Sequence, residues 1–161
     1  MKKYTYDSKI GNISIISSDE YLNQIILKSQ LIHNDEPNSI ILETKKQLNE
    51  YFDGKRVEFD LPFEITGTDF EKKILAEMIA IPYGETHSYK ELAESAGYHG
   101  ASRATGTVCK YNRLPIIIPC HRVVKSDGSI GEYVGGKALK KYLIELEKFS
   151  KINWHRNQKK L

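Results

Sequence analysis

The chain of 161 residues has little cysteine, with Cys109 and Cys120 alone and no Cys-x-x-Cys pair. This scarcity excludes a disulfide framework and is typical of proteins in a reducing compartment, so we expect a cytoplasmic location. The five histidines are scattered, and no spacing among them predicts a metal site. No apolar stretch is long enough to span a bilayer, and no apolar segment follows the N-terminal lysines as in a secretory signal.

Charge is unevenly distributed along the chain. Residues 1–67 hold 8 Lys and Arg against 11 Asp and Glu, whereas residues 68–161 hold 16 against 10. A basic second part suits a polyanionic partner such as nucleic acid. At this magnitude, the charge is equally compatible with an ordinary solvated surface.

The first part of the chain has the pattern of a small sheet followed by a helix. Residues 13–16 and 22–27 are short β-prone runs separated by a polar turn composition. Pro37-Asn38-Ser39 then offers a helix start, and Asp53-Gly54 offers a helix end. We interpret residues 61–67 as a linker to the second part.

The second part contains several helix signals. Two capping boxes, in which Ser or Thr is followed three residues later by Glu, predict helix starts at Thr68 with Glu71 and at Ser88 with Glu91. The first helix is predicted to end before Pro82. The second, joined through a glycine-containing turn to another helix over about 101–110, predicts a helix-turn-helix. A last helix is predicted over 137–148.

The segment Pro119-Cys120-His121-Arg122-Val123-Val124 carries the clearest chemical signal. It follows the apolar run 116–118, which predicts a short buried strand ending at Pro119. Cys120 is therefore expected at a strand end, beside an imidazole and a guanidinium. Because a thiol attacks as the thiolate and such neighbours lower its pKa, Cys120 is a candidate nucleophile. A buried structural cysteine remains the alternative.

This segment resembles the active-site motif of the O6-alkylguanine-DNA alkyltransferases, also called methylated-DNA–protein-cysteine methyltransferases. The resemblance is nearly continuous over residues 68–147 and looser over residues 1–67. Further matching positions lie at residues 81–89, Ser102-Arg103-Ala104, Gly106 and Asn112 upstream, and at Gly131, Tyr133, Gly135-Gly136 and Glu147 downstream. The chain is therefore identified as a member of this family.

The resemblance implies an α+β fold in two domains. Residues 1–67 are expected to form an N-terminal ribonuclease-H-like sheet-and-helix domain. Residues 68–161 are expected to form a helix-turn-helix, winged-helix-like catalytic domain with a basic tail from about residue 148. It further implies a DNA repair protein that flips O6-alkylated guanine out of double-stranded DNA and transfers the alkyl group irreversibly to Cys120, once per molecule. We expect no cofactor, no metal and no membrane partner, and a monomer; O4-alkylthymine is left open as a second substrate.

The resemblance also implies individual catalytic roles. Cys120 is the nucleophile, His121 is the base that reaches the thiol through a water, and Glu147 orients His121. Tyr89 donates a hydrogen bond to guanine N3 as negative charge develops on the base. Arg103 is the wedge that fills the space left by the flipped base. Taken singly, each of these residues could instead be an ordinary surface or packing residue without a catalytic role.

Other residues are expected at the DNA or in the substrate pocket. Small side chains let the recognition helix approach the DNA, and a hinge connects that helix to the cysteine segment. These DNA-binding positions are Ala101, Ser102, Ala104, Gly106, Asn112 and Arg113, and the predicted pocket positions are Pro115, Val123, Tyr133 and Val134. Arg113 replaces a proline that is usual in the family, and Val134 stands where many members have serine. Cys109 is a second thiol, which we interpret as a packing residue.

The principal alternative function is a non-catalytic, alkyl-lesion-binding helix-turn-helix protein. Such proteins share the fold and flip the base, but they lack the cysteine, so Cys120 argues against this interpretation. A helix-turn-helix regulator and a cysteine hydrolase with repeated turnover are further alternatives.

Overall fold

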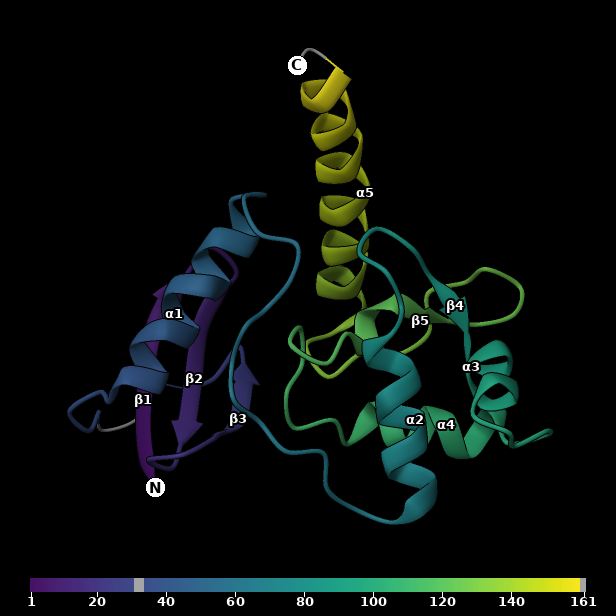
Figure 1. Ribbon diagram of the computed structural model, residues 1–161, viewed down its shortest axis with the longest axis horizontal. Helices are drawn as coiled ribbons and strands as arrows, with labels where there is room; N and C mark the ends of the chain where they lie inside the picture. Colours follow the sequence, from purple (N-terminus) through teal and green to yellow (C-terminus); the bar gives the residue numbers. More distant parts are fainter. Residues whose placement is uncertain (31–33, 160–161) are drawn as a thin grey trace. The chain divides into compact units, whose positions relative to one another are not determined.

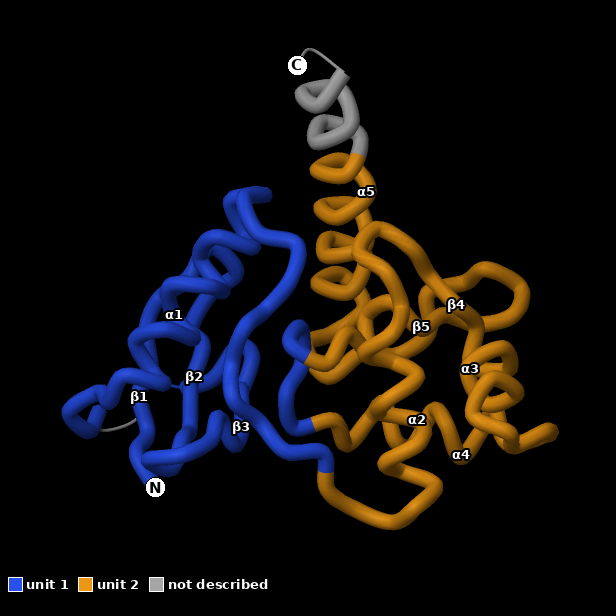
Figure 2. The backbone as a smooth tube through the Cα atoms, viewed as in Figure 1, with its two compact units in different colours: residues 1–65, 113–117 blue, residues 66–112, 118–161 orange. Residues whose placement is uncertain are grey.

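The computed structural model describes the backbone of residues 1–30 and 34–159, and the side chains of residues 1–30 and 34–151 (Figure 1). The chain forms two compact units (Figure 2). One unit contains residues 1–65 together with 113–117, and the other contains residues 66–112 together with 118–161. Among the described residues, no helix is both long and apolar enough to cross a membrane.

The first unit is built on a three-stranded antiparallel sheet in the order β1-β2-β3. Its strands are β1 (Lys2–Ser8), β2 (Gly11–Ser17) and β3 (Leu22–Leu27). The two runs predicted as strands are confirmed as β2 and β3. Strand β1 was not predicted, because its lysines, tyrosines and threonine give no apolar run. It forms by pairing along its whole length with β2, for example Tyr6 with Ile13.

Helix α1 (Ser39–Phe52) confirms the predicted helix and its end signals. The side chain of Asn38 accepts a hydrogen bond from the backbone N–H of Ile41 at 2.9 Å, which satisfies one of the free donors of the first turn. Ile41, Leu48 and Phe52 are buried. The helix packs against β2 and β3, as Figure 1 shows, and so covers one face of the sheet.

The predicted strand over 116–118 is wrong. Ile116 has a φ of +76°, and the residues around it form a turn instead of a continuous strand. The segment passes from the first unit, where the backbone N–H of Ile25 donates to the carbonyl of Arg113 at 2.9 Å, into the second unit at Ile118. All three isoleucines are buried. An apolar run therefore predicted burial correctly, whereas periodicity has no power to distinguish a strand from another buried conformation.

The second unit begins with the helices that the capping boxes predicted. Helix α2 (Asp69–Ile79) is capped by Thr68, and helix α3 (Tyr89–Ser95) is capped by Ser88. Each cap accepts a hydrogen bond from the backbone N–H three residues later. Gly97, with a φ of +89°, leads out of α3. Helix α4 (Ser102–Lys110) then packs against α3 and completes the helix-turn-helix.

The remaining elements surround the cysteine segment. A 3₁₀-helix, η1 (Cys120–Arg122), leads directly into β5 (Val123–Val124), which pairs in parallel with β4 (His87–Ser88). Helix α5 (Lys137–Lys159) contacts η1. This helix extends beyond the predicted end at 148, so the region expected as a tail starts as helix. The side chains of residues 152–161 lie outside the described part of the chain.

The capping of α2 generates a test of local stability. Thr68→Ala removes the side-chain acceptor of the Glu71 N–H, so we expect a loss of about 1 kcal/mol in the free energy of unfolding, measured by urea titration. Thr66→Ala, an exposed change two residues earlier, is the matched control and should stay within about 0.5 kcal/mol. Equal losses in the two variants would show that the cap contributes nothing.

Candidate active site

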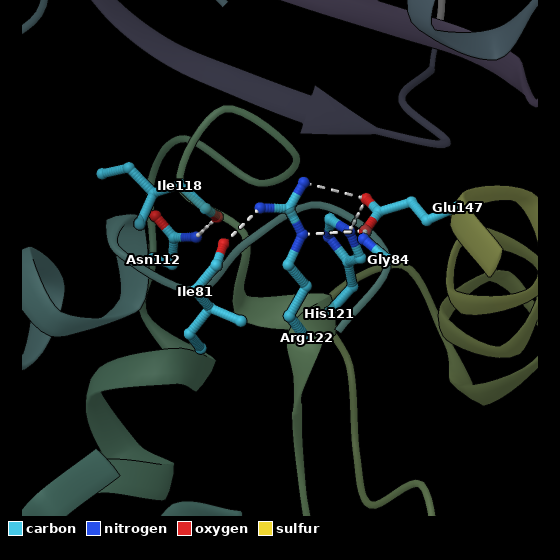
Figure 3. A network of polar contacts seen from close by, with 7 residues as sticks. All are labelled: Ile81, Gly84, Asn112, Ile118, His121, Arg122 and Glu147. Atoms are coloured by element: carbon cyan, nitrogen blue, oxygen red, sulfur yellow. Dashed lines mark hydrogen bonds and ion pairs between the residues drawn. The ribbon is translucent and has the colours of Figure 1, made fainter. Parts of the chain in front are cut away.

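Cys120 lies at the first position of η1 and is 2% exposed. The side-chain amide of Asn112 donates both to the carbonyl of Ile118 at 2.9 Å and to Sγ of Cys120 at 3.2 Å. Figure 3 shows Asn112 pointing toward Ile118. Because Asn112 lies two residues after the end of α4, this one side chain joins the end of the second helix of the helix-turn-helix to the cysteine.

The Cys120 thiol is protonated at neutral pH. Burial raises its pKa to about 11, against the hydrogen bond from Asn112 and the positive charge of Lys140, which both lower it. The structure therefore does not hold a preformed thiolate. Nucleophilic chemistry at this sulfur requires a base that takes the proton.

The carboxylate of Glu147, which is 1% exposed, accepts hydrogen bonds from His121, Arg122 and Gly84 (Figure 3). Nε2 of His121 lies 2.5 Å from Oε2. The Arg122 guanidinium approaches as a fork, with Nε 2.8 Å from Oε1 and Nη2 3.1 Å from Oε2. The backbone N–H of Gly84 donates to Oε1 at 3.1 Å. Helix α5, η1 and the loop after α2 thus meet at a single carboxylate.

The charges of this cluster follow from burial and hydrogen bonding. Burial alone raises the pKa of Glu147, but its bonds to His121 and Arg122 outweigh this effect and lower that pKa to about 2. Burial lowers the pKa of His121 in spite of Glu147, so the imidazole is neutral at pH 7. Since an ionised carboxylate only accepts, Nε2 of His121 carries the proton. Nδ1 is consequently the basic nitrogen of the ring, and Arg122 supplies the charge that keeps Glu147 ionised.

Arg122 has a structural position that the sequence left open. The guanidinium is buried, and its Nη1 donates to the carbonyl of Ile81 at 2.7 Å in addition to the two bonds with Glu147. It also lies over the ring of Tyr83, 5.7 Å from the ring centroid. With these contacts the guanidinium faces the interior, where it balances the charge of Glu147 and connects η1 to the end of α2.

Tyr89 and Lys140 form a second polar pair. Tyr89 is the first residue of α3, and its hydroxyl lies 3.3 Å from Nζ of Lys140 on α5. Burial raises the pKa of Tyr89 to about 12. Lys140 was not predicted as a site residue. Helical spacing in the sequence could have indicated it, because Lys140, Leu143 and Glu147 fall on one face of α5. All three residues are buried in the structure.

The other predicted site residues lie on or after the helix-turn-helix. Arg103 and Ala104 are exposed on α4, and Ala101 is the N-cap of that helix without a side-chain cap bond. Ser102 and Gly106 are partly exposed, and a side chain at Gly106 would contact the Tyr89 ring, with its Cβ 3.9 Å away.

The predicted pocket residues fall in both units. Val123 is fully buried in β5, Tyr133 is half-buried, and Val134 is 52% exposed. Arg113, which is exposed, and Pro115, which is buried, belong to the unit of residues 1–65. Within the described residues there is no group of three or more His, Cys, Asp or Glu that suits a metal ion.

Sequence models of two domains match the chain. The model of the 6-O-methylguanine DNA methyltransferase DNA binding domain matches residues 69–149, and that of the ribonuclease-like domain of the same family matches residues 1–65. The chain belongs to this family. The sequence resemblance and the expected two-domain α+β fold are thereby confirmed.

Individual members of the methyltransferase family are similar over nearly the whole chain. The methylated-DNA–protein-cysteine methyltransferase of Mycobacterium tuberculosis is 38% identical over 150 residues, covering 89% of this chain and 90% of that protein. The constitutive methylated-DNA–protein-cysteine methyltransferase of Bacillus subtilis is 34% identical over 158 residues, covering 91% of this chain and 94% of that protein. The crystal structure of Mycobacterium tuberculosis OGT in complex with DNA superimposes with a TM-score of 0.83 at 37% identity, covering 91% of this chain and 92% of that one.

The buried carboxylate generates a pH-dependent test. The pKa of Glu147 falls from 4.5 to about 2 on folding, so its ionised form stabilises the fold by about 3 kcal/mol above pH 4.5, and this contribution is lost as the pH falls toward 2. We therefore expect Glu147→Gln to be less stable than the wild type by about 3 kcal/mol at pH 7 in urea unfolding. The difference in unfolding free energy between the wild type and Glu147→Gln should become smaller below pH 4.5.

Glu145→Gln, an exposed change on the same helix, is the matched control and should leave the unfolding free energy unchanged at either pH. If Glu147→Gln lowered the unfolding free energy by the same amount at pH 7 and at pH 3, this would contradict the conclusion that Glu147 is ionised in the folded protein.

Proposed function

We propose that this protein repairs DNA by transferring the O6-alkyl group of guanine to Sγ of its own Cys120. The observation that carries the proposal is the arrangement of the buried Cys120 thiol, the adjacent neutral His121 and the ionised Glu147 that fixes the His121 tautomer. This is the nucleophile, base and orienting group that activation of a buried thiol requires. The names of the M. tuberculosis and B. subtilis relatives describe methyl transfer between methylated DNA and a protein cysteine.

The proposed chemistry begins with proton transfer. Nδ1 of His121 takes the thiol proton through a water, and Glu147 stabilises the imidazolium that results. Sγ then attacks the alkyl carbon, the bond between that carbon and O6 breaks, and its electron pair stays on the guanine. The hydroxyl of Tyr89 donates a hydrogen bond to guanine N3 and stabilises the developing charge. The product is a thioether, which has no easy reverse path, so each molecule acts once and needs no cofactor.

The partner is proposed to be double-stranded DNA, from which the base must be flipped to reach a buried sulfur. Three features of α4 support this role. Arg103 is exposed and long enough to enter the stack as a wedge, and its neighbours are small. The first turn has no side-chain cap, which leaves backbone N–H groups for phosphate oxygens. The DNA-binding positions are Ala101, Ser102, Arg103, Ala104, Gly106, Asn112 and Arg113.

Asn112 is proposed as the hinge between DNA recognition and chemistry, because it follows α4 and bonds to the Cys120 segment. We propose that Pro115, Val123, Tyr133 and Val134 line the site of the flipped base. O4-alkylthymine remains a candidate second substrate.

We further propose residues 1–67 as a supporting domain and residues 68–161 as the catalytic domain. The limits of the two family matches, at residues 65 and 69, support this boundary. A cytoplasmic location is proposed from the free thiols of Cys109 and Cys120, which suit a reducing compartment. We propose that the protein acts as a monomer.

The assignment of Cys120 as the nucleophile is tested by measuring the mass of the intact protein after reaction. Incubation with duplex DNA containing O6-methylguanine should add a single methyl group to the intact wild-type protein, on the peptide that contains Cys120. Cys120→Ala should gain no methyl group while still binding the DNA, because binding depends on α4. Cys109→Ala, which removes the other free thiol, is the control and should be methylated like the wild type. Methylation of Cys120→Ala at any residue would overturn the mechanism.

The assignment of Arg103 as the wedge is tested by comparing transfer rates on duplex DNA and on a free base. Arg103→Ala should slow transfer from duplex DNA on the order of tenfold to a hundredfold, because it loses a few kcal/mol of help with unstacking. Transfer from the free base O6-benzylguanine, which needs no flipping, should keep its wild-type rate. Lys110→Ala, which removes an exposed charge at the other end of α4, should have a smaller effect on the duplex. Equal losses on duplex and free base would instead place Arg103 in support of the pocket.

A further inference from the structure

Strand β1 (Lys2–Ser8) forms one edge of the three-stranded sheet in the first unit, as Figure 1 shows. It pairs with β2 on one side, so the backbone groups of alternate residues point away from the sheet. An edge strand presents its outward N–H and C=O groups to any other extended chain, and folded proteins usually cover or blunt such edges. The way in which β1 is covered therefore decides which chains can pair with it.

Asn34 and Asp35 cover the outer edge of β1 with four hydrogen bonds, and we call these two residues the edge strap. The side-chain amide of Asn34 accepts from the N–H of Thr5 at 2.8 Å and donates to the carbonyl of Thr5 at 3.0 Å. The carboxylate of Asp35 accepts from the N–H of Lys3 at 2.8 Å, and its backbone N–H donates to the carbonyl of Lys3 at 2.9 Å. The edge strap thus supplies the donors and acceptors that a neighbouring antiparallel strand would supply.

The edge strap differs from the cover on the opposite edge of the sheet. On β3, the N–H of Ile25 donates to the backbone carbonyl of Arg113 at 2.9 Å. Three of the four bonds of the edge strap instead use a side-chain atom, and both of its residues are exposed. Hydrogen bonds at an exposed position open locally at low cost in free energy. Of the two edges, that of β1 is therefore the easier to uncover while the sheet stays folded.

The uncovered edge of β1 is complementary to itself. In an antiparallel pair of two β1 strands centred on Thr5, Lys3 of one copy lies opposite Asp7 of the other, and the two-fold axis repeats this contact. By the alternation along the strand, the backbone groups of all three residues point outward. The side chains of Lys3 and Asp7 are exposed, and opposite charges that face each other across two strands stabilise the pair. A shift of two residues in either direction loses both contacts.

We propose that the outer edge of β1 is a self-association surface for a second copy of this chain, and that the edge strap keeps this surface closed. The closed form is the monomer. Opening the edge strap frees the N–H and C=O groups of Lys3 and Thr5, and β1 of the second copy satisfies them by strand addition in the register centred on Thr5. Each copy contributes its β1 edge to a two-fold pair, so association stops at a dimer and does not continue to a fibre.

The edge strap is tested by removing its side chains. The double variant Asn34→Ala/Asp35→Ala loses three of the four bonds. We expect its average mass in sedimentation equilibrium to rise with protein concentration toward twice that of the wild type, which should stay monomeric over the same range. Glu36→Ala, an exposed change at the next residue, is the matched control and should also stay monomeric. A double variant that remains monomeric, or that aggregates without limit, would overturn the proposal.

The register is tested by charge reversal in the same double variant. Adding Lys3→Glu sets two carboxylates opposite each other at both contacts, and adding Asp7→Lys sets two ammonium groups opposite each other. Each change should weaken the dimer on the order of tenfold or more. A mixture of the two proteins restores opposite charges at both contacts, so native mass spectrometry should show a heterodimer about as tight as the parent dimer. Association of Lys3→Glu alone that equals association of the mixture would place the contact elsewhere.

A variant of nearly unchanged size tests the amide of Asn34. A carboxylate only accepts, so Asn34→Asp keeps the bond from the Thr5 N–H and loses the bond to the Thr5 carbonyl. We expect it to dimerise more than the wild type and less than the double variant. A purely monomeric Asn34→Asp would remove the amide donor from the edge strap.

Two measurements keep these results separate from misfolding and from the proposed function. Urea unfolding of each variant verifies that association is measured on folded protein. In dilute solution, the strap variants should transfer the alkyl group of O6-benzylguanine to Cys120 at the wild-type rate, because the edge strap lies in the first unit. Association is measured without DNA or substrate, so its outcome stands whether or not the wild type is alkylated on Cys120.

Discussion

A single carboxylate, that of Glu147, accepts hydrogen bonds from groups that are far apart in the sequence. It lies on the last helix and is bound by His121 and Arg122 of η1 and by the backbone of Gly84 after α2. In the interior a carboxylate left without such partners carries a large desolvation penalty, so these donors must all be in place for the second unit to hold its form. The same bonds set the tautomer of His121. The stability of the unit and the tautomer of the proposed base therefore depend on the same hydrogen bonds.

The sulfur of Cys120, the proposed nucleophile, lies buried as a thiol. Burial raises the pKa of Cys120 to about 11, and the nearby imidazole is neutral. A protein that acts once per molecule loses its function if its thiol reacts with an unintended electrophile, and a protonated, nearly inaccessible thiol is a poor nucleophile. In the proposed mechanism, the thiol is activated when it gives its proton to His121. Buried polar networks of this kind require every member to be satisfied.

Short hydrogen-bonded links within the second unit connect the helix-turn-helix to the surroundings of Cys120. Asn112 joins the end of α4 to Cys120, and Tyr89 at the start of α3 meets Lys140 of α5. The first link starts just after α4, and the second starts at the first residue of α3.

The sequence by itself determined the elements whose signals are local. Caps such as Thr68 and Ser88 predict a helix start because their partners are three residues away, and the short β-prone runs of β2 and β3 are recognised within a few residues. The family, and the fold that it implies, were predicted from the resemblance of the motif residues to those of a known family. Only tertiary structure decided the pairing of β1, the turn at Ile116, the interior position of Arg122 and the burial of Lys140. Each of these depends on a partner distant in the chain, and burial of a charged side chain is favourable only once the groups that accept its hydrogen bonds have been assembled by the fold.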